Sequence, residues 1–125
     1  MFMKKLFIVL FFFICLSVNA AEMKTNFSNE IFKNAKDSGK TIVVNSYEVW
    51  CPTCHTQTKI LNEAENEFKD IIFLSYEQST NKDIAKKLDI KFRTTIVVYK
   101  GNNEVARVVG QTDKKIIYAA IKKGI

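Results

Sequence analysis

Four short runs of mostly apolar, often β-branched residues stand out along the chain. They are Thr41–Tyr47 (TIVVNSY), Ile71–Tyr76 (IIFLSY), Thr95–Tyr99 (TIVVY) and Glu104–Val109 (EVARVV). The first three are nearly continuous in their apolar character, which is typical of strands buried on both faces. Only the turn residues Gly101-Asn102-Asn103 separate the last two runs, so we expect those two strands to pair antiparallel.

Between the strands, apolar residues recur at helical spacing. We expect helices over Asn29–Asp37 after a cap at Ser28, over Thr53–Phe68, from a cap at Asn81 through Leu88, and from Thr112 or Asp113 onward. The side chains expected to face the core from these helices are Ile31, Phe32, Ala35, Ile60, Leu61, Ala64, Phe68, Ile84, Ala85, Leu88, Ile116, Ile117, Ala120 and Ile121. The lead-in from Ala21 to Phe27 could add an edge strand.

The order of these elements is (β)αβαβαββα. It predicts an α/β fold with a central mixed sheet of four to five strands, flanked by helices on both faces. No internal repeat or linker interrupts this order, so we expect residues 21–125 to form one domain.

The first twenty residues have a pattern of their own. Lys4 and Lys5 form a charged start, Leu6–Leu16 is an unbroken apolar run, and residues 17–20 (SVNA) end in an acceptable cleavage site before Ala21. This three-part pattern is typical of a secretory signal peptide. The apolar run is shorter than the roughly 20 residues that span a bilayer, which favours cleavage over a retained anchor. We therefore expect residues 1–20 to direct export to a periplasmic or secreted location, and Cys15 to be removed with them.

Composition and charge narrow the function classes. The chain has 125 residues, of which 47% are hydrophobic and 26% charged, so it is neither a disordered tail nor a low-complexity array. Its net charge of +6 falls to +4 without Lys4 and Lys5. The remaining lysines are scattered rather than clustered on one element, as nucleic-acid binding would require. We therefore expect no nucleic-acid partner.

Two cysteines remain beyond the leader, Cys51 and Cys54, within the run Trp50-Cys51-Pro52-Thr53-Cys54-His55. A disulfide between residues so close closes almost no loop, so chemistry explains the pair better than stability does. The pair lies where the first buried strand passes into the long helix, and the positive end of that helix favours a thiolate. We expect Cys51 to be the exposed nucleophile and Cys54 the resolving thiol.

With these residues in view, the chain resembles the thioredoxin superfamily from about Ser28 to Lys123. The motifs that carry the resemblance are Trp50-Cys51-Pro52-Thr53-Cys54 after a strand, the strand and turn at 94–101 (TTIVVYKG), and Val109-Gly110 before the last helix. The resemblance implies a thioredoxin-like fold, thiol–disulfide exchange through Cys51 and Cys54, and no cofactor or metal. It also implies a groove that binds the partner protein, formed by Trp50, Pro52, Thr53, Arg93 and Thr94. In this groove the Trp50 ring would pack beside the two sulfurs.

The chain departs from the family pattern at three positions. Thr94, preceded by Arg93, occupies the place of the family's cis-proline; a cis bond at a non-proline costs about 2.5–4 kcal/mol, so we expect a trans bond. The Thr94 hydroxyl would then face the sulfurs, and a proline introduced there should bring turnover closer to that of the family. Asn45 replaces a buried acid that takes a proton in cytosolic-type members, and Tyr47 replaces a common Trp. We expect Arg93 to favour the thiolate or an acidic partner, and Tyr47 and Phe92 to lie in the core.

Two other classes stay open at this point. Cys51-x-x-Cys54-His55 is also the attachment pattern of c-type haem, with His55 as proximal ligand and Met23 as the candidate thioether opposite it. Cytochromes of this size are helical, however, and strand-like runs flank the motif here. The third class is a non-enzymatic metal site in which Cys51, Cys54 and His55 hold copper or zinc.

The function predicted from the sequence is an exported thiol–disulfide oxidoreductase that exchanges electrons with protein cysteines. Thr53 stands where typical oxidising relatives have His, which favours a reductant over a disulfide-forming oxidase. Its partners would be protein thiols or disulfides in the exported compartment, together with a membrane electron donor or acceptor.

Overall fold

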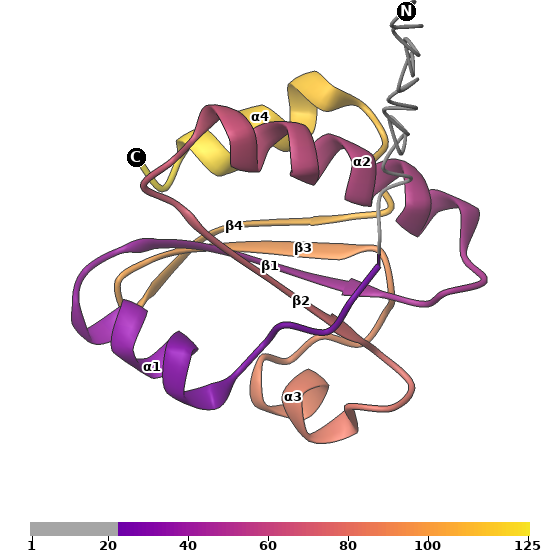
Figure 1. Cartoon of the computed structure of the whole chain (residues 1–125), viewed down its shortest axis with the longest axis horizontal. Helices are drawn as coiled ribbons and strands as arrows, with labels where there is room; N and C mark the ends of the chain where they lie inside the picture. Colours follow the sequence, from indigo (N-terminus) through magenta and orange to yellow (C-terminus); the bar gives the residue numbers. More distant parts are fainter. Residues whose placement is uncertain (1–22) are drawn as a thin grey trace, which may run out of the picture.

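The computed structural model describes residues 23–125 (Figure 1). Along the chain the elements are α1 (Asn29–Asp37), β1 (Thr41–Tyr47), α2 (Pro52–Glu67), β2 (Ile72–Glu77), α3 (Lys82–Lys87), β3 (Thr95–Lys100), β4 (Asn103–Val109) and α4 (Lys114–Lys122). Each agrees with a predicted element to within two residues at either end. The predicted leader, residues 1–20, lies outside the described residues.

The strands form one mixed sheet in the order β2-β1-β3-β4. β1 pairs parallel with β2 and antiparallel with β3, and β3 pairs antiparallel with β4, as the short turn between them predicted. β1 is therefore a central strand, and all seven of its residues are buried. The chain leaves the middle of the sheet at the point where the cysteine motif begins.

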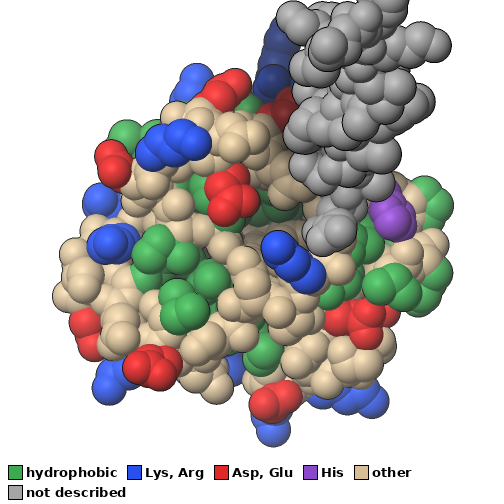
Figure 2. Space-filling model, in the orientation of Figure 1, with side chains coloured by type: hydrophobic (Ala, Val, Ile, Leu, Met, Phe, Trp, Pro, Cys, Tyr) green, Lys and Arg blue, Asp and Glu red, His purple; other side chains and the backbone are tan. Residues whose placement is uncertain are grey.

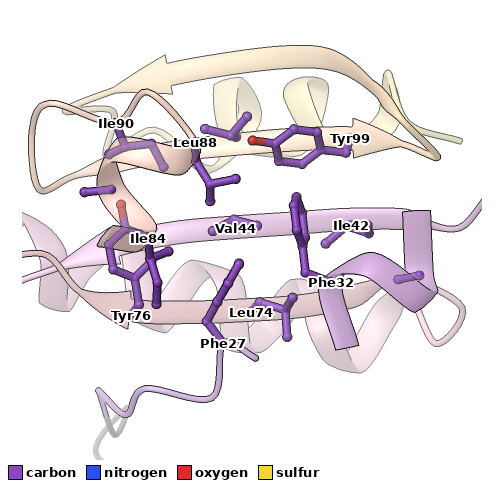
Figure 3. Close-up of a cluster of buried hydrophobic side chains, with 13 residues drawn as sticks. Phe27, Phe32, Ile42, Val44, Leu74, Tyr76, Ile84, Leu88, Ile90 and Tyr99 are labelled. Atoms are coloured by element: carbon purple, nitrogen blue, oxygen red, sulfur yellow. The ribbon is translucent and has the colours of Figure 1, made fainter. Parts of the chain in front are cut away.

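Helices cover both faces of the sheet, as expected. Figure 1 shows α2 and α4 together on one face and α1 and α3 on the other. The buried side chains divide in the same way: α2 and α4 pack with Val43, Ile96 and Val98. On the other face, Phe32 of α1 and Ile84 of α3 belong to a separate cluster (Figure 3). Alternate residues of β1 and β3 thus supply two distinct cores.

The core under α1 and α3 is rich in aromatic rings. The centroids of Phe32 and Tyr99 lie 5.2 Å apart, and those of Phe27 and Tyr76 lie 6.2 Å apart, both in edge-on arrangements. Burial of the Tyr99 phenol raises its pKa to about 12, and burial raises the pKa of Tyr76 well above its ordinary value. Both tyrosines therefore belong to the core in their neutral form.

A lead-in segment, residues 23–27, runs along the free edge of β2. The backbone N–H groups of Asn26 and Phe27 donate to Ser75 O at 3.0 and 3.1 Å, and Ser75 N donates to Asn26 Oδ1 at 2.6 Å. Thr25 Oγ1 lies 3.1 Å from the Tyr47 hydroxyl. The segment is bonded to the sheet without being a regular strand, so the sheet of the described residues has four strands.

Four side chains differ from their predicted positions or contacts. Ile31 and Ile116 are 46% and 43% exposed, because each precedes the residue that faces the sheet, Phe32 or Ile117, and lies about 100° away around the helix. Asn81 is the N-cap residue of α3, as predicted, but its side chain makes no capping hydrogen bond; the side-chain amide instead donates to Glu77 O at 2.9 Å. Phe92, expected in the core, is 64% exposed because it lies in the loop before β3. None of the helices among residues 23–125 is long and apolar enough to cross a membrane.

Candidate active site

Cys51 occupies the N-cap of α2, at the junction with β1. Its sulfur accepts a hydrogen bond from Cys54 N at 3.2 Å, and its own N–H donates to Glu48 O at 3.1 Å. Pro52 follows at the first helical position, where its missing N–H leaves no hydrogen bond broken. The local sequence thus places a sulfur where the free N–H groups and the positive end of α2 favour negative charge.

The two cysteines are joined in a disulfide, with their Cα atoms 5.2 Å apart. Cys54 is fully buried and Cys51 is 2% exposed, so the prediction of an exposed Cys51 was wrong for the oxidised state. The bond turns both sulfurs toward each other, and Met23 of the lead-in segment packs against the cluster that they form with Tyr47. Because both cysteines are buried, a partner must displace neighbouring side chains to reach the disulfide.

Trp50 and Arg93 come together at the surface beside the motif. Trp50 is 64% exposed, so it is not a core aromatic, and the Arg93 guanidinium carbon lies 4.5 Å from the centroid of its ring. Pro52 is exposed and Thr53 half-buried on the first turn of α2. Phe92 and Val49, the chain neighbours of Arg93 and Trp50, are also exposed, so apolar side chains and one cation lie at the surface here. In Figure 2 the single histidine marks this end of the molecule, next to hydrophobic atoms.

Thr94 has an unusual backbone. Its φ is +72°, in the left-handed region that a β-branched residue rarely adopts, and no cis peptide bond occurs among residues 23–125, so the Arg93–Thr94 bond is trans as predicted. Its N–H donates to Ser46 O at 2.9 Å. Proline has neither this φ nor an N–H, so the expectation that proline would restore family-like turnover conflicts with the geometry of this loop. The Thr94 hydroxyl forms no hydrogen bond to either sulfur.

Two buried polar residues flank the motif on the β1 side. Asn45 is buried within β1, at the position where the family pattern has an acid. Glu48 is also buried, and its two carboxylate oxygens accept hydrogen bonds from Ser79 N at 2.6 Å and Ser79 Oγ at 3.0 Å. Because Glu48 O also accepts from Cys51 N, this residue ties the loop after β2 to the turn that presents Cys51.

The haem and metal alternatives gain no support from this arrangement. His55 is exposed, and its Nε2 lies 2.8 Å from Val49 O. The motif lies in an α/β fold rather than in the helical fold expected of a small cytochrome. Within residues 23–125, no three His, Cys, Asp or Glu side chains are grouped so that they could hold a metal ion.

Sequence reasoning missed two residues of this region, Gln57 and Glu48, and gave Met23 only the role of a candidate haem ligand. Gln57 carried a signal, since it lies three and four positions before Ile60 and Leu61 and so on the buried face of α2. Glu48 carried no signal, because only folding brings Ser79 to its carboxylate. Folding likewise brings Met23 to the cluster of Tyr47, Cys51 and Cys54.

Comparison with known proteins agrees with this geometry. The model of the family described as Thioredoxin matches residues 18–123. A thioredoxin H-type of Fagopyrum esculentum is 31% identical over 90 residues, covering 72% of this chain and 78% of its own. Thioredoxin-2 of Saccharomyces cerevisiae is 30% identical over 95 residues, covering 75% and 86%.

Solved structures show the same similarity. The thioredoxin NaTrxh of Nicotiana alata superposes with a TM-score of 0.69 at 26% identity, covering 76% of this chain and 82% of its own. Trxlp from Edwardsiella tarda reaches a TM-score of 0.73 at 24% identity, covering 76% and 94%, which shows a common fold.

Proposed function

Because this chain belongs to the thioredoxin family of thiol–disulfide oxidoreductases, we propose that Cys51 and Cys54 are its redox couple, with Cys51 as nucleophile and Cys54 as resolving thiol. The observation that carries the proposal is the disulfide between these residues at the N-terminus of α2. A bond that closes within one helical turn forms and breaks without unfolding the helix.

The exchange proceeds in two balanced steps when the protein acts as a reductant. The Cys51 thiolate attacks one sulfur of a partner disulfide; a mixed disulfide forms, and the other partner sulfur leaves as a thiolate that takes up a proton. Cys54, deprotonated, then attacks the Cys51 sulfur, forms the Cys51–Cys54 bond and releases the second partner thiolate. Two electrons pass from the dithiol to the partner. The N-terminus of α2 stabilises the Cys51 thiolate both as nucleophile and as leaving group.

Single cysteine variants test these two roles. We expect Cys51→Ser to abolish insulin reduction, since no nucleophile remains. We expect Cys54→Ser to attack substrates once and to accumulate mixed disulfides, which intact mass detects as adducts that dithiothreitol removes. Lys59→Ala, an exposed change further along α2 that keeps both thiols, is the control. A fully active Cys51→Ser protein would refute the proposal that Cys51 is the nucleophile.

We further propose that the physiological direction is reduction. Two features support it: the relatives described above are thioredoxins, and Thr53 stands where oxidising members of the wider superfamily have His. A redox titration read by intact mass tests the direction. A midpoint near the thioredoxin value of roughly −270 mV fits a reductant, whereas one near roughly −120 mV fits a disulfide-forming oxidase.

The proposed site of action is an exported compartment, with a membrane protein as electron donor. The charged start at Lys4 and Lys5, the apolar run Leu6–Leu16 and the small residues at 17–20 support export. Fractionation of bacteria that express the full chain tests this proposal. We expect the protein in the periplasmic fraction, with the mass of a chain that begins at Ala21. Retention in the cytoplasm with residues 1–20 intact would refute export and leave the exchange chemistry standing.

A further inference from the structure

Gln57 is a fully buried polar side chain on α2, three residues after Cys54. The neighbouring positions on this face of the helix, Ile60, Leu61 and Ala64, are apolar and pack into the core. Burial of an amide costs free energy unless hydrogen bonds compensate for the lost water. The contacts that compensate Gln57 are therefore informative about its role.

The Gln57 amide nitrogen bonds two separate loops. Nε2 donates to Thr94 O at 2.9 Å and to Gln111 O at 3.0 Å. Gly110 N also donates to Thr94 O at 3.0 Å, so the two loops meet at this carbonyl. The Gln57 carbonyl oxygen has no hydrogen-bond partner among the described residues. Both amide hydrogens are thus used on the loops, and the acceptor is left unused.

The loop that Gln57 reaches is the one that presents Phe92 and Arg93 to solvent. This loop lacks a proline, and Thr94 takes a strained φ of +72°. Backbone strain of this kind costs about 1–3 kcal/mol and persists only where the surroundings enforce it. β1 enforces it from one side, because Ser46 O accepts from Thr94 N and Ser46 Oγ donates to Phe92 O at 2.8 Å. From α2, the bond to this loop comes from Gln57.

We propose that Gln57 is a positioning residue that ties the helix bearing the dithiol to the partner-facing loop 92–94 and to Gln111. It holds the Phe92–Arg93 surface at a set position relative to the Cys51 sulfur, so that a protein disulfide docked on that surface lies in line for attack. The inference rests on the proposed exchange function. It concerns docking of protein substrates rather than the chemistry at sulfur.

The test compares a protein disulfide with a small one. The proteins are wild type, Gln57→Met, which keeps the length of the side chain but removes both donors, and Thr58→Val as the matched control. Thr58 is buried next to Gln57 on the same helix, whereas the bonds to Thr94 O and Gln111 O come from Gln57. Each protein is pre-reduced and mixed with insulin or with 5,5′-dithiobis(2-nitrobenzoate), and its oxidation is followed by the fluorescence of Trp50, the single tryptophan.

For Gln57→Met we expect the second-order rate constant with insulin to fall by about three- to tenfold, the scale of one or two lost hydrogen bonds. The rate constant with the small disulfide should stay within twofold, and the redox midpoint should not move. Amide hydrogen exchange at Thr94 and Thr95 should accelerate. Thr58→Val should leave the ratio of the two rate constants unchanged. A side chain that only stabilised the core would not alter this ratio.

Three outcomes overturn the inference: an unchanged insulin rate in Gln57→Met, a parallel fall with both disulfides, or an equal shift of the ratio in Thr58→Val. If Gln57→Met does not fold, the wild-type side-chain amide gives the answer by NMR. Nε2 hydrogens that exchange as fast as those of an exposed glutamine would mean that the two bonds are absent. Failure of the proposed function looks different, because wild type would then match Cys51→Ser with both disulfides.

Discussion

Thr94 shows how the backbone of a single residue fixes the loop beside the cysteines. It adopts a backbone conformation suited to glycine, yet its N–H and C=O both form hydrogen bonds, to Ser46 and to Gln57 and Gly110. These bonds hold the strain in place at the point where the partner surface begins. Position 94 therefore requires a residue that can adopt a positive φ and that has a backbone N–H. The family pattern, which has proline at this position, would not predict this requirement.

Substitutions at Thr94 should separate these two requirements. We expect Thr94→Gly to raise the free energy of unfolding by up to about 1 kcal/mol, because glycine relieves the left-handed strain at some cost in chain entropy. Thr94→Pro should lower it by about 3 kcal/mol, since it forbids this φ and removes the bond to Ser46 O. Urea unfolding measures both. Thr112→Gly, at an exposed position outside the helices, controls for the entropy cost, and equal effects at 94 and 112 would contradict the strain.

At the scale of elements, β1, α2 and the lead-in segment together form the site. β1 leads from the middle of the sheet to Cys51, α2 supplies the helix N-terminus, and residues 23–27 place Met23 against the cluster of Tyr47 and the two cysteines. The first two are properties of local sequence. The third depends on bonds between the segment and Ser75, about fifty residues away.

The same distinction explains what could be predicted. Apolar, β-branched runs predicted the strands of residues 23–125, and apolar residues at helical spacing predicted their helices. The cysteine spacing at a strand–helix junction indicated the pair that the disulfide joins. The burial of Cys51, the exposure of Phe92 and the bonds of Gln57 depend on which loops meet in space. No local pattern specifies that, so these features became visible only in the folded chain.

Removal of the Met23 side chain should make the Cys51–Cys54 disulfide more accessible to a reductant. In Met23→Ala we expect tris(2-carboxyethyl)phosphine to reduce Cys51–Cys54 severalfold faster than in wild type, because the cluster of Tyr47, Cys51 and Cys54 loses a side chain that packs against it. Reaction progress is read by intact mass after alkylation of free thiols. Lys24→Ala, an exposed change at the next position, should leave the rate unchanged. Equal rates in Met23→Ala and wild type would show that Met23 does not control access.

At the scale of the whole molecule, the two faces of the sheet carry cores of different chemistry. The face under α2 and α4 is mostly aliphatic, with the Phe68–Tyr118 pair at its margin. The face under α1 and α3 contains Phe27, Phe32, Tyr76 and Tyr99 (Figure 3). Among the described residues, the phenols whose pKa burial raises most, those of Tyr76 and Tyr99, lie on the second face, so their ionisation at alkaline pH should destabilise that face.

Stability should therefore fall at high pH in a way that depends on Tyr99. The folded-state pKa of about 12 lies above the ordinary value of 10.0, so the folded chain holds this proton more tightly than the unfolded chain. The contribution is complete below pH 10 and is lost as the pH rises toward 12. Urea midpoints between pH 8 and 11.5 should drop less steeply in Tyr99→Phe than in wild type. Parallel curves for the two proteins would contradict a buried Tyr99 phenol.

The hydrogen bonds between residues 23–27 and β2 also bear on self-association. A strand at the border of a sheet offers unpaired N–H and C=O groups to any other chain. Here Asn26 and Phe27 occupy Ser75 O, Asn26 Oδ1 occupies Ser75 N, and Thr25 Oγ1 occupies Glu77 N. A chain shortened to begin at Ser28 would leave these groups free next to half-buried Phe73, a template for intermolecular pairing. Residues 23–27 thus also occupy the backbone groups through which β2 could pair with a second chain.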